Sequence, residues 1–512
     1  MTNSSNTKRI ARNTILLYFR MFLTMGISLY TSRIVLNTLG VVDFGIYNVV
    51  GGVVIMFSFL NSSMSSATQR FLSFELGRND FVQLKKVFSM SINIHAIIAL
   101  TILILAETIG LWFLNAKLNI PAGRLVAANW VYQFSILSFM VNVLSVPYNA
   151  TIIAHERMNV YAYVGIVEIV LKLMIVFTLV WFGFDKLKMY AILVFTVSLI
   201  VFSLYRFYCK RNFSESNYKF FWEQSLYKTL MSYAGWNLFG NLAAVAMGQG
   251  VNILLNLFFG PIVNAARGIA YQVNGAINGF VSNFQMAMNP QIIKSYAAND
   301  HIYMQQLIFQ GSKYSFFLLY FLSLPVLLQT GTLLHLWLKI VPEYTILFCQ
   351  LVLIDTLINC ISGPLMTAAQ ATGKIKKYQV VVGGLLLFNL PLSYLLLKQG
   401  FAPQFTLYIT ISLSITALFA RLWILKNLIK FSVPEFFRQV LLKVILVTIL
   451  SIIIPLIAKQ FITREIISFF VTCLLSVISV IAIIYWVGLK GQERNFAKEK
   501  ILQKISKLRT KS

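Results

Sequence analysis

Long runs of apolar residues, separated by short polar segments, extend over almost the whole chain. A hydrocarbon layer about 30 Å thick requires about 20 predominantly apolar residues per helix. By that measure the pattern predicts fourteen membrane-spanning helices, the first interrupted by Arg20. The predicted limits are 13–36, 44–66, 86–114, 124–153, 159–182, 187–208, 230–258, 262–291, 311–338, 344–370, 378–397, 404–427, 438–458 and 464–489. We therefore expect an all-α, polytopic membrane protein.

Composition and charge agree with this pattern. Of 512 residues, 58% are hydrophobic and only 12% are charged, which is more apolar than a soluble domain. A net charge of +27 suggests nucleic acid as a partner, but the basic residues are distributed unevenly between alternate loops. One set of loops holds about 30 Lys and Arg and the other about ten, which predicts that both termini are cytoplasmic. The basic excess then reflects topology and anionic lipids, and we expect no nucleic-acid partner.

Two stretches of the chain are repeated about 220 residues later, which indicates a duplicated bundle. Leu39 Gly40 … Gln69 … Asn79 Asp80 matches Phe259 Gly260 … Gln291 … Asn299 Asp300, and Pro147 … Ala150 … Ala154 … Arg157 … Tyr161 matches Pro364 … Thr367 … Ala371 … Lys374 … Tyr378. Two six-helix lobes with an even number of spans are related in parallel, not by inversion. The predicted parts are an N-terminal lobe at 1–220, a C-terminal lobe at 221–430, an extra helix pair at 431–489 and a basic cytoplasmic tail at 490–512.

Polar residues gather on single faces of a few predicted spans. The seventh span carries Asn237, Asn241, Gly248, Asn252 and Asn256, and the eighth carries Arg267, Tyr271, Asn274, Asn278, Gln285 and Asn289. The first span carries Arg20, Thr24, Ser28 and Thr31, and the second carries Asn48, Gly52, Asn61, Ser65 and Gln69. Because polar groups are costly at bilayer depth, we expect these stripes to line one hydrated cavity. The alternative is that the amides only join helices by hydrogen bonds.

Basic residues within the spans give the expected cavity its chemistry. Arg20 and Lys172 lie deep in the first and fifth spans, and Arg267 lies at the start of the eighth. A guanidinium stays protonated and binds phosphate through two parallel hydrogen bonds, so this set suits an anionic, phosphorylated substrate. The predicted substrate-binding residues are Arg20, Lys172, Asn252, Arg267, Asn274 and Asn278.

Acidic residues at membrane depth are candidates for coupling to protons or ions. Glu107 in the third span and Asp355 in the tenth have no evident partner in the sequence. Glu168 precedes Lys172 by four residues, which puts both on one helix face, so a structural ion pair and a proton or ion relay are both open. Each acid either titrates during a transport cycle or stays neutral because of its burial.

Motifs of catalysis and cofactor binding are absent from the sequence. It contains no HExxH, no GxSxG and no phosphate-binding glycine loop, and its four cysteines form no CxxC pair. The predicted outer loops are short, the longest lying near 115–123. We therefore expect no enzyme activity, no cofactor and no metal site.

Three segments resemble a known family. They are Arg9 Ile10 Ala11 Arg12 Asn13 Thr14, then Thr38 Leu39 Gly40 Val41 Val42 Asp43 Phe44 Gly45 Ile46 Tyr47, and Ala154 His155 Glu156 Arg157. The second has the pattern LG-x-x-DFG-x-Y, which is the most specific. The chain resembles the polysaccharide flippases of the multidrug/oligosaccharidyl-lipid/polysaccharide exporter superfamily, and the likeness includes a MATE-like repeat of six and six spans.

The resemblance implies a transporter of the bacterial inner membrane. Such a protein moves an undecaprenyl-diphosphate-linked oligosaccharide repeat unit from the cytoplasmic to the periplasmic leaflet by alternating access. The product serves the biosynthesis of O-antigen (lipopolysaccharide), capsule or exopolysaccharide. The implied partners are that glycan lipid, anionic lipids, and a polysaccharide polymerase or glycosyltransferases. No individual binding residue is transferred from the family.

Two other functions fit the same pattern less well. A cation-coupled multidrug exporter of the same fold needs an acidic or aromatic cavity, whereas the predicted cavity is net basic. A membrane-embedded polysaccharide polymerase or ligase needs a sizeable outer loop for its catalytic residues, and the predicted outer loops are too short.

Overall fold

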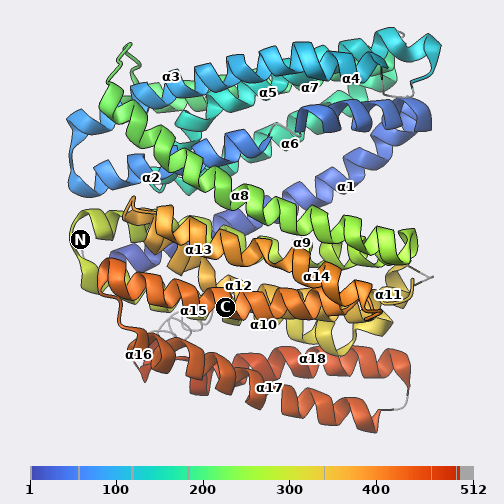
Figure 1. Ribbon diagram of the computed structural model, residues 1–512, viewed down its shortest axis with the longest axis vertical. Helices are drawn as coiled ribbons and strands as arrows, with labels where there is room; N and C mark the ends of the chain where they lie inside the picture. Colours follow the sequence, from blue (N-terminus) through green and yellow to red (C-terminus); the bar gives the residue numbers. More distant parts are fainter. Residues whose placement is uncertain are drawn as a thin grey trace, which may run out of the picture. The chain divides into compact units, whose positions relative to one another are not determined.

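The computed structural model describes residues 3–55, 58–116, 120–181, 185–338, 341–462, 464–491 and 493–495. These residues form helices and short connections, with no strand among them (Figure 1). Eleven of the described helices are long and apolar enough to cross a membrane. The prediction of an all-α, multi-pass membrane protein is confirmed. The count of fourteen stays a prediction, since α1, α2 and α9 are not among the eleven.

The described chain forms two compact units, and the first contains residues 1–242, 286–304 and 367–383. Its elements are α1 (Asn3–Ile55), α2 (Ser58–Arg78), α3 (Phe81–Leu105), the π-helical turn η1 (Ala106–Gly110), α4 (Leu111–Ala116), the 3₁₀ turn η2 (Ala122–Arg124), α5 (Leu125–Ala154), α6 (Met158–Trp181), α7 (Lys186–Asn212), η3 (Ser214–Ser216) and the first part of α8 (Gln224–Phe259). Helix α5 packs against α7 and α2, and α1 packs against α6. An apolar core of this unit joins α2, α3, α5 and α7.

The second unit contains residues 243–285, 305–366 and 384–512. Its elements come from the rest of α8, α9 (Pro261–Ala297), α10 (His301–Leu328), α11 (Thr330–Leu338), α12 (Thr345–Ala371), α13 (Lys376–Leu387), α14 (Asn389–Lys398), α15 (Phe405–Ile429), α16 (Val433–Phe436), η4 (Phe437–Leu441), α17 (Leu442–Phe461), α18 (Glu465–Ile483) and η5 (Ile484–Gly488). Helices α17 and α18 form a pair and pack on each other (Figure 1). Gln329 beside α10 binds this pair by donating to the carbonyl of Ser468 at 3.2 Å.

The compact units do not coincide with the predicted lobes. The C-terminal end of α9 and the segment joining α12 to α13 belong to the first unit, although they lie in the second half of the chain. Polar contacts account for this, because Glu156 of the α5–α6 connection binds the end of α9 and Arg70 of α2 binds the end of α12. The lobe limits at 220 and 430 stay predictions about duplication.

The two predicted copies share local backbone features. Gly40 interrupts α1 with φ 79°, and Gly260 separates α8 from α9 with φ 76°. Such a conformation is accessible to glycine because it has no Cβ. Asn79 and Asn299 both have φ 59°, and each precedes an aspartate that caps the next helix. Asp80 accepts a hydrogen bond from the N–H of Gln83 at 2.9 Å, and Asp300 accepts one from the N–H of Tyr303 at 3.0 Å.

The predicted basic tail at 490–512 lies almost entirely outside the described residues. Its described part consists of residues 490, 491 and 493–495. The basic cytoplasmic tail is therefore still a prediction.

Candidate functional site

The first unit contains a polar cavity between α1 and α6. It has a volume of about 380 Å³. Helix α1 contributes Arg20, Thr24, Ile27, Ser28 and Thr31, and α6 contributes Tyr161, Gly165, Glu168, Ile169 and Lys172. These positions recur at i, i+4, i+7, i+8 and i+11 along each helix, so each helix presents one mainly polar stripe to the other. Three predicted residues, Arg20, Lys172 and Glu168, therefore lie around one cavity.

Arg20 is held over an aromatic ring at this cavity. Its guanidinium carbon lies 4.3 Å from the ring centre of Tyr161, which is a cation–π contact. Gly165 makes room for it, because a Cβ at that position would lie 2.9 Å from Cδ of Arg20. The buried Nε of Arg20 has no hydrogen-bond partner among the described residues. An arginine that lines a polar cavity and has an unused donor is available to bind an anion.

Glu168 and Lys172 form the predicted pair on α6. Nζ of Lys172 lies 2.6 Å from Oε1 of Glu168, and the two side chains are 47% and 37% exposed. Both therefore remain accessible from the cavity while paired. Together with Arg20 they leave one net positive charge at the cavity. The ion pair exists in this structure, and the role of Glu168 as a relay stays a hypothesis.

Arg267 in the second unit repeats the arrangement of Arg20. Its guanidinium carbon lies 4.5 Å from the ring centre of Tyr271, and Nη2 donates to the hydroxyl of that tyrosine at 3.3 Å. The residue is buried, and its Nε also has no partner among the described residues. Both predicted arginines thus stack on a tyrosine and keep one donor unused.

The predicted amides of the second unit mostly bind neighbouring helices. Asn264 donates to the carbonyl and to Oδ1 of Asn252 at 3.1 and 3.2 Å. Asn274 accepts a hydrogen bond from the hydroxyl of Thr356 at 2.7 Å, and Asn278 is half-buried. The stripes behave partly as the alternative interpretation predicted, since they join helices. The assignment of these three asparagines to a substrate cavity stays a prediction.

Two further amides of the seventh span also join helices. Asn237 accepts from Nε2 of Gln379 at 2.9 Å, and Asn241 donates to the hydroxyl of Ser63 at 3.0 Å. Both contacts lie within the first unit. They connect α8 to α13 and α2.

The remaining acidic candidates have polar partners. Asp355 on α12 accepts hydrogen bonds from the hydroxyl of Ser414 at 2.6 Å and from Nδ2 of Asn359 at 3.0 Å. Glu107 accepts from Nε2 of Gln133 at 3.1 Å. Neither carboxylate is isolated, so a coupling role requires that these partners change during transport. Within the described ranges, no group of three or more His, Cys, Asp or Glu side chains is placed to hold a metal ion.

A buried carboxylate joins the beginning of α1 to the end of α9. Glu156, in the α5–α6 connection, has a side chain that is 0% exposed. Its Oε2 lies 2.7 Å from Nε of Arg9, and its Oε1 accepts from Nζ of Lys294 at 2.6 Å. Gln291 also donates to this carboxylate. This cluster was not predicted from the sequence, although Glu156 belongs to one of the segments that resemble the flippases.

Arg70 on α2 binds the end of α12 in a similar way. Its Nε donates to the carbonyl of Gln370 at 3.2 Å, and its Nη2 donates to the carbonyl of Ala371 at 2.6 Å. A cation at the last carbonyls of a helix satisfies groups that have no intrahelical partner. We call the contacts of Glu156 with Arg9, Gln291 and Lys294, together with those of Arg70 at the end of α12, the helix-end clasp.

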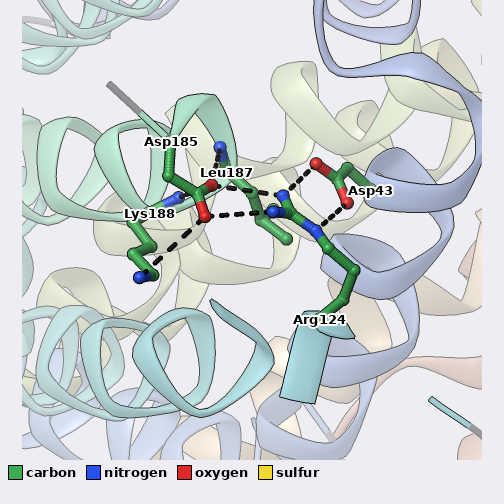
Figure 2. A network of polar contacts seen from close by, with 5 residues as sticks. All are labelled: Asp43, Arg124, Asp185, Leu187 and Lys188. Carbon is green, nitrogen blue, oxygen red and sulfur yellow. Dashed lines mark hydrogen bonds and ion pairs between the residues drawn. The ribbon is translucent and has the colours of Figure 1, made fainter. Parts of the chain in front are cut away.

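An arginine between two aspartates binds together the elements at the other end of α5. Figure 2 shows Arg124 between Asp43 and Asp185. Its Nε donates to Oδ1 of Asp43 at 2.8 Å, and its Nη1 donates to Oδ2 of Asp185 at 3.0 Å. Asp185 also accepts from the N–H groups of Leu187 and Lys188, so it caps α7. The aspartate of the LG-x-x-DFG-x-Y pattern therefore connects α1 to η2 and α7.

Acid is expected to weaken this contact. Burial raises the pKa of Asp185, but the hydrogen bonds from Arg124 and from the N–H groups of Lys188 and Leu187 outweigh it and hold the pKa below its ordinary value. A carboxyl with a lowered pKa stabilises the fold at neutral pH and loses that contribution below about pH 4. Thermal unfolding of the purified protein should therefore show an acid-sensitive loss on the order of 1 kcal/mol that Arg124→Gln removes. Lys188→Gln is the control and should keep the acid-sensitive loss, since its Nζ is 3.9 Å from Asp185. An acid sensitivity in Arg124→Gln equal to that of the wild type would contradict the assignment.

Comparisons with known proteins support the fold and no closer relationship. No protein-family model matches the chain, and no curated protein does. Among solved structures, it is similar to an outward-facing multidrug resistance MATE family transporter of the MOP superfamily, with a TM-score of 0.69 and 13% identity over 82% of this chain and 95% of that one. It is also similar to a MOP superfamily transporter from Pyrococcus furiosus described as having a binding pocket of reverse polarity, with a TM-score of 0.68 and 13% identity over 83% and 97%. A third is the MATE transporter VcmN of Vibrio cholerae in the bent form, with a TM-score of 0.66 and 17% identity over 83% and 98%. The chain thus has the fold of MATE transporters of the MOP superfamily.

Proposed function

We propose that the protein is a flippase for an undecaprenyl-diphosphate-linked oligosaccharide. The observation that supports this most is the cavity of α1 and α6, with Arg20 and Lys172 on its walls and an unused guanidinium donor beside it. A lipid-linked glycan has a diphosphate and many hydroxyl groups, which need cations and polar side chains, respectively, at membrane depth. The hydroxyls of Thr24, Ser28 and Thr31 and the carboxylate of Glu168 line the same cavity and would hydrogen-bond the sugar hydroxyls.

The helix-end clasp is compatible with transport by alternating access. Its contacts join residues of the first half of the chain to the ends of α9 and α12, which belong to the second half. If the halves move as lobes, these contacts form when one side closes and break when that side opens. With both termini cytoplasmic, as the distribution of basic loops predicts, this closed side is the cytoplasmic one. Asp355, Glu107 and Glu168 are our candidates for coupling the movement to an ion gradient.

The second candidate is a cation-coupled multidrug exporter, because one of the similar structures is a multidrug resistance transporter. A cationic drug needs acidic or aromatic partners. The cavity between α1 and α6 offers Glu168 and Tyr161, but Lys172 already neutralises the carboxylate and Arg20 already covers the ring. The basic cavity therefore favours the anionic substrate. The description of a reversed pocket polarity in the Pyrococcus protein gives a precedent for such a difference within the fold.

A deletion strain tests the proposed function in the cell. Without the protein, we expect lipid-linked repeat units to accumulate on the cytoplasmic face of the inner membrane and surface polysaccharide to be lost. The location of the units is read from their protection against a membrane-impermeant glycan-binding probe in spheroplasts. Accumulation of translocated but unpolymerised units would instead indicate a polymerase or ligase. Unchanged polysaccharide together with increased drug sensitivity would indicate the multidrug exporter.

A further inference from the structure

A second cavity of the first unit lies beside the helix-end clasp. It has a volume of about 310 Å³ and is lined by the beginning of α1 and by the α5–α6 connection. Arg9 and Arg12 come from α1, and His155, Glu156 and Arg157 come from the connection. Three guanidiniums thus face one small cavity, and none of the predicted substrate-binding residues lines it.

The groups that line this cavity differ in how far they are already engaged. Glu156 is buried and binds Arg9 and Lys294. His155 has Nε2 2.5 Å from Oε1 of Glu215, and its ring stacks on Phe213 at 4.0 Å. Arg12 and Arg157 are exposed, and no ion pair with an acid is found for either among the described residues. The cavity therefore offers two guanidiniums to a ligand, while a third is shared with Glu156.

The position of the cavity limits the kind of anion that reaches it. Asn13 is both a lining residue and the first residue of the first predicted span, so on that prediction the cavity lies at the level where a helix enters the membrane. Phosphate groups of lipids lie at this level. Two guanidiniums from different elements match a ligand with two adjacent phosphates better than one with a single phosphate.

We propose that this cavity binds the diphosphate of the lipid-linked substrate before transport, and that the bound anion draws Arg9 away from Glu156. The proposal rests on the function proposed above and adds a loading site to it. Loss of Arg9 leaves the buried carboxylate with Lys294 as its one cationic partner among the described residues. A buried carboxylate with less compensating charge is less stable, so the contact with the end of α9 weakens. Binding of substrate thereby releases the side of the protein from which it enters.

A buried reporter cysteine can measure this release. Ala287 on α9 is 0% exposed and packs with Leu17, Ile153 and Met158 in the first unit. In a background with Cys209, Cys349, Cys360 and Cys473 changed to Ala, Ala287→Cys should react slowly with a water-soluble maleimide. Inorganic pyrophosphate should accelerate this labelling about tenfold. The combined change Arg12→Gln and Arg157→Gln should remove the acceleration, and Arg211→Gln, at the exposed end of α7, should leave it intact.

Further arms of this experiment identify the occupant. Inorganic phosphate, and phosphatidylglycerol supplied in nanodiscs without pyrophosphate, should accelerate labelling much less than pyrophosphate does. An equal effect of phosphatidylglycerol would overturn the assignment to a diphosphate, and no effect of pyrophosphate would overturn the loading site itself. Ala298→Cys, exposed just beyond α9, serves as the reporter of reagent activity and should react at one rate throughout. Because labelling needs no transport, failure here is distinguishable from failure of glycan export in the deletion strain.

Discussion

Arg20→Ala is expected to abolish glycan export in the deletion strain while the amount of protein in the membrane stays the same. The guanidinium is the cation at the α1–α6 cavity with an unused buried donor, and alanine removes both its charge and its planar fork. Loss of the contact with Tyr161 costs only about 0.5–2 kcal/mol, so folding should survive. Surface polysaccharide and membrane abundance are measured together by blotting.

Three other variants make this result specific. Arg20→Lys keeps a charge without the fork and should give partial export. Arg267→Ala should also abolish export, because Arg267 has the same stacked arrangement in the second unit. Arg211→Ala, exposed at the end of α7, is the matched control and should export normally. Normal export in both Arg20→Ala and Arg267→Ala would remove the cationic cavity from the mechanism.

Glu156→Gln is expected to open the helix-end clasp. The change removes a buried negative charge and leaves Arg9 and Lys294 close together without it. Removing one partner from a buried ion pair typically costs about 3–5 kcal/mol of stability. In this protein we expect much of that loss in the contact between the α5–α6 connection and α9. Labelling of Ala287→Cys should therefore accelerate at least tenfold, without any added anion.

A surface glutamate provides the comparison for this variant. Glu223 lies 3.7 Å from Lys86 with 41% of its side chain exposed, so Glu223→Gln removes the same charge from a solvated ion pair. Its effect on labelling should be negligible. A labelling rate for Glu156→Gln that equals the rate for Glu223→Gln would show that Glu156 does not hold α9.

The hydrophobic pattern was sufficient to predict an all-α membrane protein and several of its helices, because each span is specified by its own residues. The predicted limits 124–153 and 404–427, for example, agree with those of α5 (125–154) and α15 (405–429) to within two residues. Gly40 and Gly260, which the predicted repeat aligns, have the same unusual backbone conformation. Local features of this kind need no knowledge of distant partners.

Long-range polar contacts were not predictable in the same way. Arg70 binds carbonyls 300 residues away, and Glu156 binds Lys294 138 residues away, so nothing in the sequence near either residue indicates its partner. The pairing of Arg20 with α6 was missed for the same reason, although both the arginine and Lys172 were identified as cations at depth. The pattern around Asp43 did mark an important residue, but its contacts with Arg124 indicate a structural role.

Transport by the purified protein in liposomes is the most direct measurement. The substrate is a fluorescent undecaprenyl-diphosphate oligosaccharide, and its leaflet is read by quenching with a membrane-impermeant reductant. The wild-type protein should move the lipid between leaflets, Arg20→Ala should not, and Arg211→Ala should match the wild type. Transport at the wild-type rate by Arg20→Ala, or no transport by a correctly folded wild-type protein under any imposed ion gradient, would contradict a cationic path for a lipid-linked diphosphate.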